Sequence, residues 1–281
     1  IDEKIIYVTD NLGYAYAFDF SENKLIWAKN YKIPFSSNLK ISNKNLFASN
    51  INNVFLILEK ENGNNVQKIP TEEVFVKNNF KNSLSQNENS IFYLNTFGSL
   101  YSINVKNFQV NWYINLNMSA GSNLTDLFNA NQLINDKGFI IVTSNKSTYI
   151  VDENSGSIIY KLNIISKIKP IIIDKYLYLI SNNNLLILFN LENGTLVYSH
   201  NLNEKISKFL NIEKKEAEFK FFTLANNKLL IILENSYFLE LDLSGELLDI
   251  DKFKSKIKSS PIFIDNSILY LDSKNKLLEI N

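Results

Sequence analysis

Residues 169–202, KPIIIDKYLYLISNNNLLILFNLENGTLVYSHNL, contain four short apolar runs separated by turn residues. The runs are rich in Ile, Leu, Tyr and Val, and Asn, Asp, Ser and Gly stand between them, which is typical of β-strands joined by tight turns. Four such strands running up and down form one antiparallel sheet. Because the middle runs are apolar on both faces, the sheet needs a neighbour on each side, and the unit is expected to repeat.

The same unit recurs along the whole chain. Its copies are spaced by about 40–50 residues, and this period with four strands per unit is typical of β-propellers. We therefore predict an all-β propeller of four-stranded antiparallel blades, with seven repeats visible and with residues 1–281 forming a single domain. The residues that align at the centre of the second strand are Tyr7, Phe47, Tyr93, Ile141, Tyr178, Ile231 and Tyr270.

The first and last repeats are incomplete. The first lacks a first strand, and the last, residues 259–281, stops after its third strand. A strand from the N-terminal segment commonly completes the last blade of a propeller, which removes an open sheet edge. We expect that segment to precede Ile1, so the N-terminal part of the intact protein is predicted to be missing here. The intact chain would then have room for an eighth blade.

The composition argues against several classes of function. The 29 basic and 29 acidic residues give a net charge of zero, so no overall field attracts nucleic acid or anionic lipid. Every basic residue is a lysine, which removes the bidentate fork that arginine offers to phosphates and guanines. The chain has no cysteine, hence no disulfide and no thiolate ligand or nucleophile. No apolar run approaches the ~18 residues of a membrane span.

Candidate catalytic residues are few. His200 is the only histidine, so neither a histidine-based triad nor a zinc cluster can be assembled, and we expect it to be exposed or to serve packing. Asp19, Asp152 and Asp242 recur after the third strand of their repeats, where a repeated carboxylate indicates turn capping. We predict that the chain is not an enzyme and has no catalytic, cofactor-binding or metal-binding residues, and that it binds no nucleic acid.

A second repeated pattern lies between the third and fourth strands. It consists of a small or acidic residue, a turn containing Gly or Asn, and then an aromatic residue. We expect each ring to wedge between neighbouring blades and to bury a large apolar surface there. The pattern resembles the PQQ-type propeller repeat over nearly the whole chain. Its aromatic residues are Trp27, Trp112, Tyr160 and Tyr198.

Within the PQQ-type propellers, the chain most resembles the family of the outer-membrane protein assembly factor BamB. Chains of that family end at the third strand of the last blade, which follows a Ser/Thr-Pro strand, and residues 259–281 show the same pattern. The segment Leu124-Thr125-Asp126 resembles the Leu-Ser-Asp loop through which the family binds its partner. That segment lies in a long connector between repeats, residues 117–137, and an earlier connector, residues 71–89, falls where the family carries a contacting arginine. In residues 71–89 the nearest cation is Lys77, and in residues 117–137 Phe128 replaces a family aspartate. The resemblance implies partner binding by Lys77, Leu124, Asp126 and Phe128.

The resemblance also implies a function and a location. The protein would be a non-catalytic scaffold of the β-barrel assembly machinery, binding the periplasmic domains of the barrel subunit and, as a second class of partner, unfolded outer-membrane proteins. It would be a periplasmic, outer-membrane-associated lipoprotein whose lipid anchor lies N-terminal to this chain. Two alternatives remain open: a propeller that binds a small molecule or a quinone cofactor, as a degenerate PQQ-dependent enzyme, and a general peptide-binding propeller.

Overall fold

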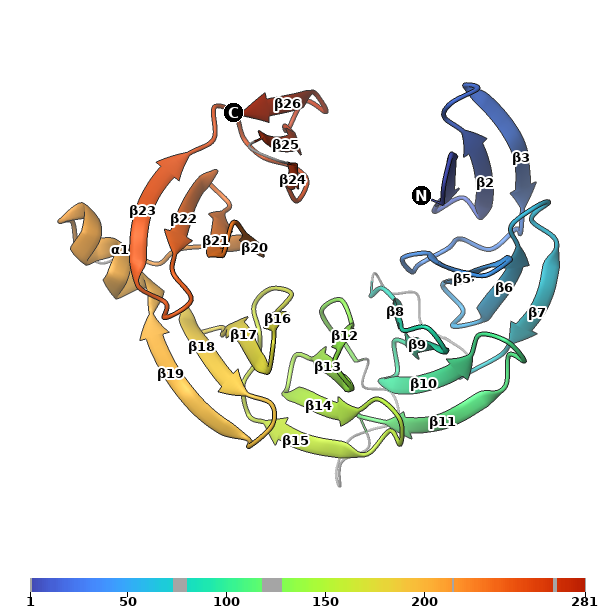
Figure 1. Cartoon of the computed structure of the whole chain (residues 1–281), viewed down its shortest axis with the longest axis horizontal. Helices are drawn as coiled ribbons and strands as arrows, with labels where there is room; N and C mark the ends of the chain where they lie inside the picture. The colour runs from blue at the N-terminus through green and yellow to red at the C-terminus, as the bar shows by residue number, and fades with distance from the viewer. Residues whose placement is uncertain (1, 73–79, 118–127, 214, 265–266, 281) are drawn as a thin grey trace. The chain divides into compact units, whose positions relative to one another are not determined.

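The computed structural model describes residues 2–72, 80–117, 128–213, 215–264 and 267–280 (Figure 1). Its contacts divide the chain into two compact units, Ile1–Asn145 with Tyr149–Lys161 and Lys146–Thr148 with Leu162–Asn281. The single domain expected from the sequence stays a prediction.

The described residues form seven antiparallel sheets, each made from strands that follow one another along the chain. Five sheets have four strands, whereas β1–β2–β3 and β24–β25–β26 have three. This topology confirms the predicted all-β propeller fold, including the missing first strand of the first repeat and the missing fourth strand of the last.

The first four sheets supply the strands up to residue 162. Their bounds are β1 (Ile5–Thr9), β2 (Tyr14–Asp19), β3 (Lys24–Asn30), β4 (Lys40–Ser42), β5 (Asn45–Ser49), β6 (Phe55–Glu59), β7 (Asn65–Ile69), β8 (Ser83–Gln86), β9 (Ser90–Leu94), β10 (Ser99–Asn104), β11 (Val110–Asn115), β12 (Ile134–Asp136), β13 (Phe139–Thr143), β14 (Thr148–Asp152) and β15 (Ile158–Leu162).

The remaining three sheets and one helix follow. Their bounds are β16 (Ile171–Ile173), β17 (Tyr176–Ile180), β18 (Leu185–Asn190), β19 (Thr195–Asn201), α1 (Leu202–Leu210), β20 (Phe219–Ala225), β21 (Lys228–Leu233), β22 (Tyr237–Leu241), β23 (Leu247–Lys252), β24 (Ile262–Ile264), β25 (Ser267–Leu271) and β26 (Leu277–Ile280).

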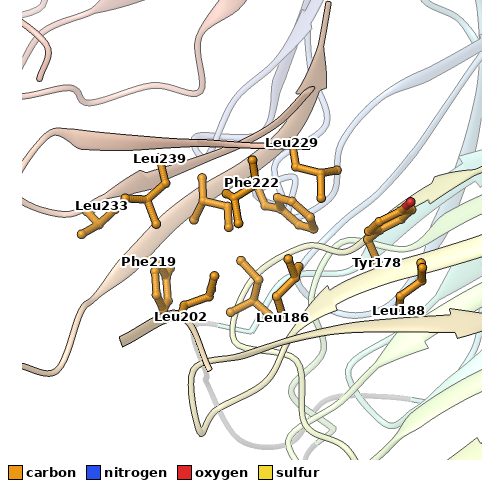
Figure 2. Close-up of a cluster of buried hydrophobic side chains, with 12 residues drawn as sticks. Tyr178, Leu186, Leu188, Leu202, Phe219, Phe222, Leu229, Leu233 and Leu239 are labelled. Atoms are coloured by element: carbon orange, nitrogen blue, oxygen red, sulfur yellow. The ribbon is translucent and has the colours of Figure 1, made fainter. Parts of the chain in front are cut away.

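The core lies between consecutive sheets. In the second unit, Tyr178 and Leu188 of the sheet β16–β19 pack against Phe222 and Leu229 of the sheet β20–β23, and Leu202 inserts the start of α1 into the same cluster (Figure 2). All seven residues aligned at the second-strand centre lie in equivalent strands and are buried. The repeat alignment therefore identified one buried strand in each of the seven sheets that the structure describes.

Two strands were missed in the sequence. β8 and β12 lie inside residues 71–89 and 117–137, which were interpreted as connectors without strands. Both are short, and β8 (SLSQ) buries Ser83 and Ser85 beside Leu84. An inner strand that buries hydroxyls gives no apolar run for sequence analysis to detect.

The aromatic residues of the second pattern lie on outer strands, and three of them reach the next sheet along the chain. Trp27 Nε1 donates a hydrogen bond to the carbonyl of Lys60 at 2.9 Å, and Trp112 Nε1 donates to that of Glu153 at 3.1 Å. In the second unit, the hydroxyl of Tyr198 donates to the carbonyl of Leu243 at 3.1 Å. Each acceptor lies in the outer hairpin turn of the next sheet.

A β-bulge precedes each of these three rings. Trp27 pairs with Ala17 and Leu25 with Phe18, so Ile26 is the extra residue of β3. The same register shift occurs immediately before Trp112 in β11 and before Tyr198 in β19. A bulge bends the strand and re-aims the residue beside it, which accounts for the direction of the rings. Tyr160 occupies the equivalent place in β15 and is half-buried.

The recurring aspartates cap turns, as predicted. Asp19 Oδ1 accepts from the amides of Ser21 and Glu22 at 2.8 and 3.0 Å, and Asp242 Oδ1 accepts from that of Glu246 at 2.9 Å. Asp152 does the same, and the Ser155 hydroxyl bonded to it is the main cause that lowers the pKa of its carboxyl. These carboxylates stay charged because the turn donates to them.

The contact between Trp112 and Gly156 provides a test of ring docking. Gly156 has φ +74°, and a Cβ placed on it would lie 2.5 Å from Trp112 Cε3. The change Gly156→Ala should cost about 1–2 kcal/mol of unfolding free energy for the left-handed backbone and about 1–3 kcal/mol more for displacing the ring. Gly138→Ala is the matched control, because Gly138 has φ +87° but nothing within 4 Å of its Cβ position. Equal losses in urea denaturation would contradict the account.

Candidate protein-interaction site

The residues expected to bind a partner fall in or beside the two long connectors. Lys77, Leu124 and Asp126 lie outside the described residues. Phe128 and the chain flanking both segments are described. The geometry of the candidate site is therefore given by the residues that hold the ends of the connectors.

Both connectors are attached to one turn, Asn95–Ser99, which joins β9 to β10. Asn95 is 1% exposed, and its Oδ1 accepts from the amides of Phe97 and Ser99, each at 3.0 Å. Gly98 follows with φ +80°. This capped turn is rigid because its own side chain satisfies the backbone donors.

Glu72 attaches the connector of residues 71–89. Its carboxylate accepts from Asn95 Nδ2 at 2.7 Å, from the hydroxyl of Tyr101 at 3.1 Å and from that of Ser99. Burial, together with the adjacent Glu72 carboxylate, raises the pKa of Tyr101, so its hydroxyl remains protonated and donates. One residue earlier, the Thr71 hydroxyl donates to the carbonyl of Asn53 at 2.6 Å.

The connector of residues 117–137 is attached to the same turn at both of its described ends. The amide of Leu116 donates to the carbonyl of Gly98 at 2.8 Å, and the amide of Phe128 donates to that of Thr96 at 2.9 Å. The ring of Phe128 covers Gly98, where a Cβ would come within 2.8 Å of it. Phe128 is 3% exposed and packs near Tyr149, so its ring gives a partner no exposed surface.

An exposed aromatic residue that the sequence did not single out lies close to this anchor. Tyr113 on β11 is 49% exposed, and its ring stacks on that of Tyr101 with centroids 5.0 Å apart. Because Tyr101 bonds to Glu72, the ring of Tyr113 is held next to the attachment point of the first connector. The only signal in the sequence was its place one residue after the docking residue Trp112.

His200, the single histidine of the chain, lies near the end of β19. His200 stacks on Tyr198 with centroids 4.5 Å apart, and its Nε2 lies 3.1 Å from the carbonyl oxygen of Ser244, so it has the packing role that was expected. No three His, Cys, Asp or Glu side chains gather into a metal site within the described ranges. In the same part of the chain, no helix has the length and apolar character of a membrane span.

Comparison with known proteins gives one family and several structures. A family model described as "Outer membrane protein assembly factor BamB" matches residues 1–199. No curated protein sequence matches the chain significantly.

Two solved structures illustrate the likeness of fold. The chain is similar to BamB from Moraxella catarrhalis, with a TM-score of 0.79 and 11% identity over 99% of this chain and 82% of that one. It is also similar to the computationally designed Ika8 protein, with a TM-score of 0.73 and 10% identity over 99% of this chain and 81% of that one. At such identities the likeness shows the fold alone.

The change Glu72→Ala tests the connector anchor. It leaves the side-chain donors of Asn95, Ser99 and Tyr101 without their acceptor in a largely buried site, which should lower the unfolding free energy by about 1–3 kcal/mol. Amide hydrogen exchange at residues 95–99 should accelerate as well. Glu61→Ala, at an exposed turn, should change neither quantity beyond ±0.5 kcal/mol. An unchanged exchange rate in Glu72→Ala would show that the carboxylate does not hold the turn.

Proposed function

The chain belongs to the family of the outer membrane protein assembly factor BamB, and from that premise we propose that it is a non-catalytic scaffold of the β-barrel assembly machinery. It would bind the periplasmic domains of the barrel subunit through the connectors of residues 71–89 and 117–137. The observation that carries the proposal is the attachment of both connectors to the single turn Asn95–Ser99.

The shared attachment favours one continuous contact surface. Glu72 holds the first connector, and the amides of Leu116 and Phe128 hold the described ends of the second. Ends that are fixed before binding reduce the conformational entropy lost when a complex forms. A partner that contacts the held end of one connector would therefore meet the held ends of the other beside it.

Charge and aromatic character suggest how the contact is made. By resemblance, Lys77, Leu124 and Asp126 supply a cation, an apolar group and an anion to it. Tyr113 adds a half-exposed ring that is already immobilised on Tyr101. Aromatic residues of this kind are frequent hot spots of protein interfaces, because they bury a large area at low entropic cost.

Location and further partners follow from the same family. We propose a periplasmic protein associated with the outer membrane through a lipid anchor outside this chain. Unfolded outer-membrane proteins are a second proposed class of partner, bound by addition of a strand to an open sheet edge.

A binding measurement with the periplasmic domains of the barrel subunit from the same organism tests the proposal. Asp126→Lys reverses a charge in the second connector and should weaken binding at least tenfold, since like charges at an interface cost several kcal/mol. Tyr113→Ala should weaken binding by a similar factor if its ring is a hot spot. Asp136→Lys is the matched control, because Asp136 is exposed in the same connector but lies in β12.

Circular dichroism establishes that each variant is folded. Equal affinity of Asp126→Lys and wild type would remove the second connector from the interface. Absence of binding by the folded wild type at tens of micromolar would reject the assembly role.

A further inference from the structure

Three successive sheets of the first unit surround a cavity of about 600 Å³. Its walls are the chain segments that lead into the innermost strands β4, β8 and β12, namely residues 35–38, 81–83 and 130–132, together with Asn11 in the turn after β1. The volume lies within the ~300–1,000 Å³ typical of small-ligand sites. No residue of the turn Asn95–Ser99 lines the cavity, and its lining residues 81–83 and 130–132 belong to the C-terminal parts of the two connectors.

Side-chain amides and hydroxyls fix the walls to one another. The Asn38 side chain bonds to the backbone of Leu84 in both directions, with Nδ2 2.7 Å from its carbonyl oxygen and Oδ1 2.8 Å from its amide nitrogen. Asn82 Nδ2 donates to the carbonyl of Asn50 at 2.9 Å, and Ser83 Oγ accepts from the amide of Leu133 at 2.8 Å. The wall is therefore formed before any ligand arrives, which lowers the entropic cost of binding.

The charge on the lining is one-sided. Among the described residues that line the cavity, Lys81 is the single charged side chain and none carries a carboxylate. Within the described part of the chain, the side chains of Lys81, Asn11 and Gln132 form no hydrogen bond or ion pair, and all three are exposed. One ammonium and two amide groups are thus available to a ligand from three sides.

We propose that this cavity binds a ligand through a carboxylate, with Lys81 as its counter-ion and the surrounding amides and hydroxyls bonding to the neutral part of the ligand. A lone ammonium without an acidic partner favours an anion. A phosphate is less suited, because its recognition usually uses arginine or several cations. A neutral sugar is also less suited, because Phe35, the aromatic residue of the lining, is 6% exposed and offers no stacking surface.

Two sources of such a carboxylate fit the site. One is the C-terminus of an extended peptide, whose main-chain amides would bond to Asn11 and Gln132. The other is a free small acid. Both share the ion pair with Lys81, and the experiment separates them by chemistry.

The test uses NMR titration of the isotopically labelled protein with N-acetyl-trialanine, with the same peptide amidated at its C-terminus, and with succinate. The proposal predicts saturable shifts that include the backbone amides of residues 81–83 and 130–132, with the free-acid peptide binding at least tenfold more tightly than the amidated one. Saturation by succinate at equal or higher affinity would identify small acids as the source. Lys81→Gln should weaken binding about tenfold, whereas Lys106→Gln, at an exposed turn between β10 and β11, should leave it unchanged.

Two results would overturn the proposal. One is equal binding of the acid and amide peptides, which would show that no carboxylate is recognised. The other is absence of saturable shifts at the cavity with any of the three probes at 20-fold the protein concentration and above, up to tens of millimolar. If the barrel subunit still binds in that case, the proposed scaffold function stands without this site.

Discussion

Sheets within each unit, such as β4–β7 and β8–β11, separate two cores, and the rest of the structure depends on that arrangement. In β5, Leu46 and Phe47 are adjacent and both 0% exposed, yet Leu46 packs with residues of the first sheet and Phe47 with residues of the third. β9 behaves in the same way, with Phe92 and Tyr93 in different clusters. Burial of a side chain of this size contributes about 1.5–3 kcal/mol, and a sheet without neighbours would lose that contribution on both faces.

At their outer edges, neighbouring sheets are joined by the docking of one aromatic ring. A bulge turns Trp27, Trp112 or Tyr198 toward the next sheet, where the ring covers Gly63, Gly156 or Gly245. A side chain at those glycines would occupy the space of the ring. Other turns place asparagine at positive φ, as at Asn23 and Asn184, because asparagine tolerates that conformation. Because asparagine takes the left-handed position in such turns, the repeat needs few glycines and persists in a chain with eight.

The sequence was sufficient for the parts of the fold that repeat. The second-strand residues, the capping aspartates and the two incomplete sheets could all be predicted because each follows from local period and turn chemistry. The short strand β8 could not, since it buries the hydroxyls of Ser83 and Ser85 where an apolar run would be expected, and β12 could not, since it has only three residues, of which two are polar. The roles of Glu72 and Phe128 were also inaccessible, because each depends on contact with a turn about 20–30 residues away in sequence.

The connectors unite these observations with the proposed function. A repeated frame fixes the turn Asn95–Ser99, the turn fixes Glu72 and Phe128, and those residues fix where the long connectors begin and end. Hydrogen–deuterium exchange of the free protein and of its complex with the periplasmic domains of the barrel subunit tests this account most directly. The account predicts joint protection of residues 71–89 and 117–137 in the complex. Protection of other connectors, with these two unchanged, would contradict it.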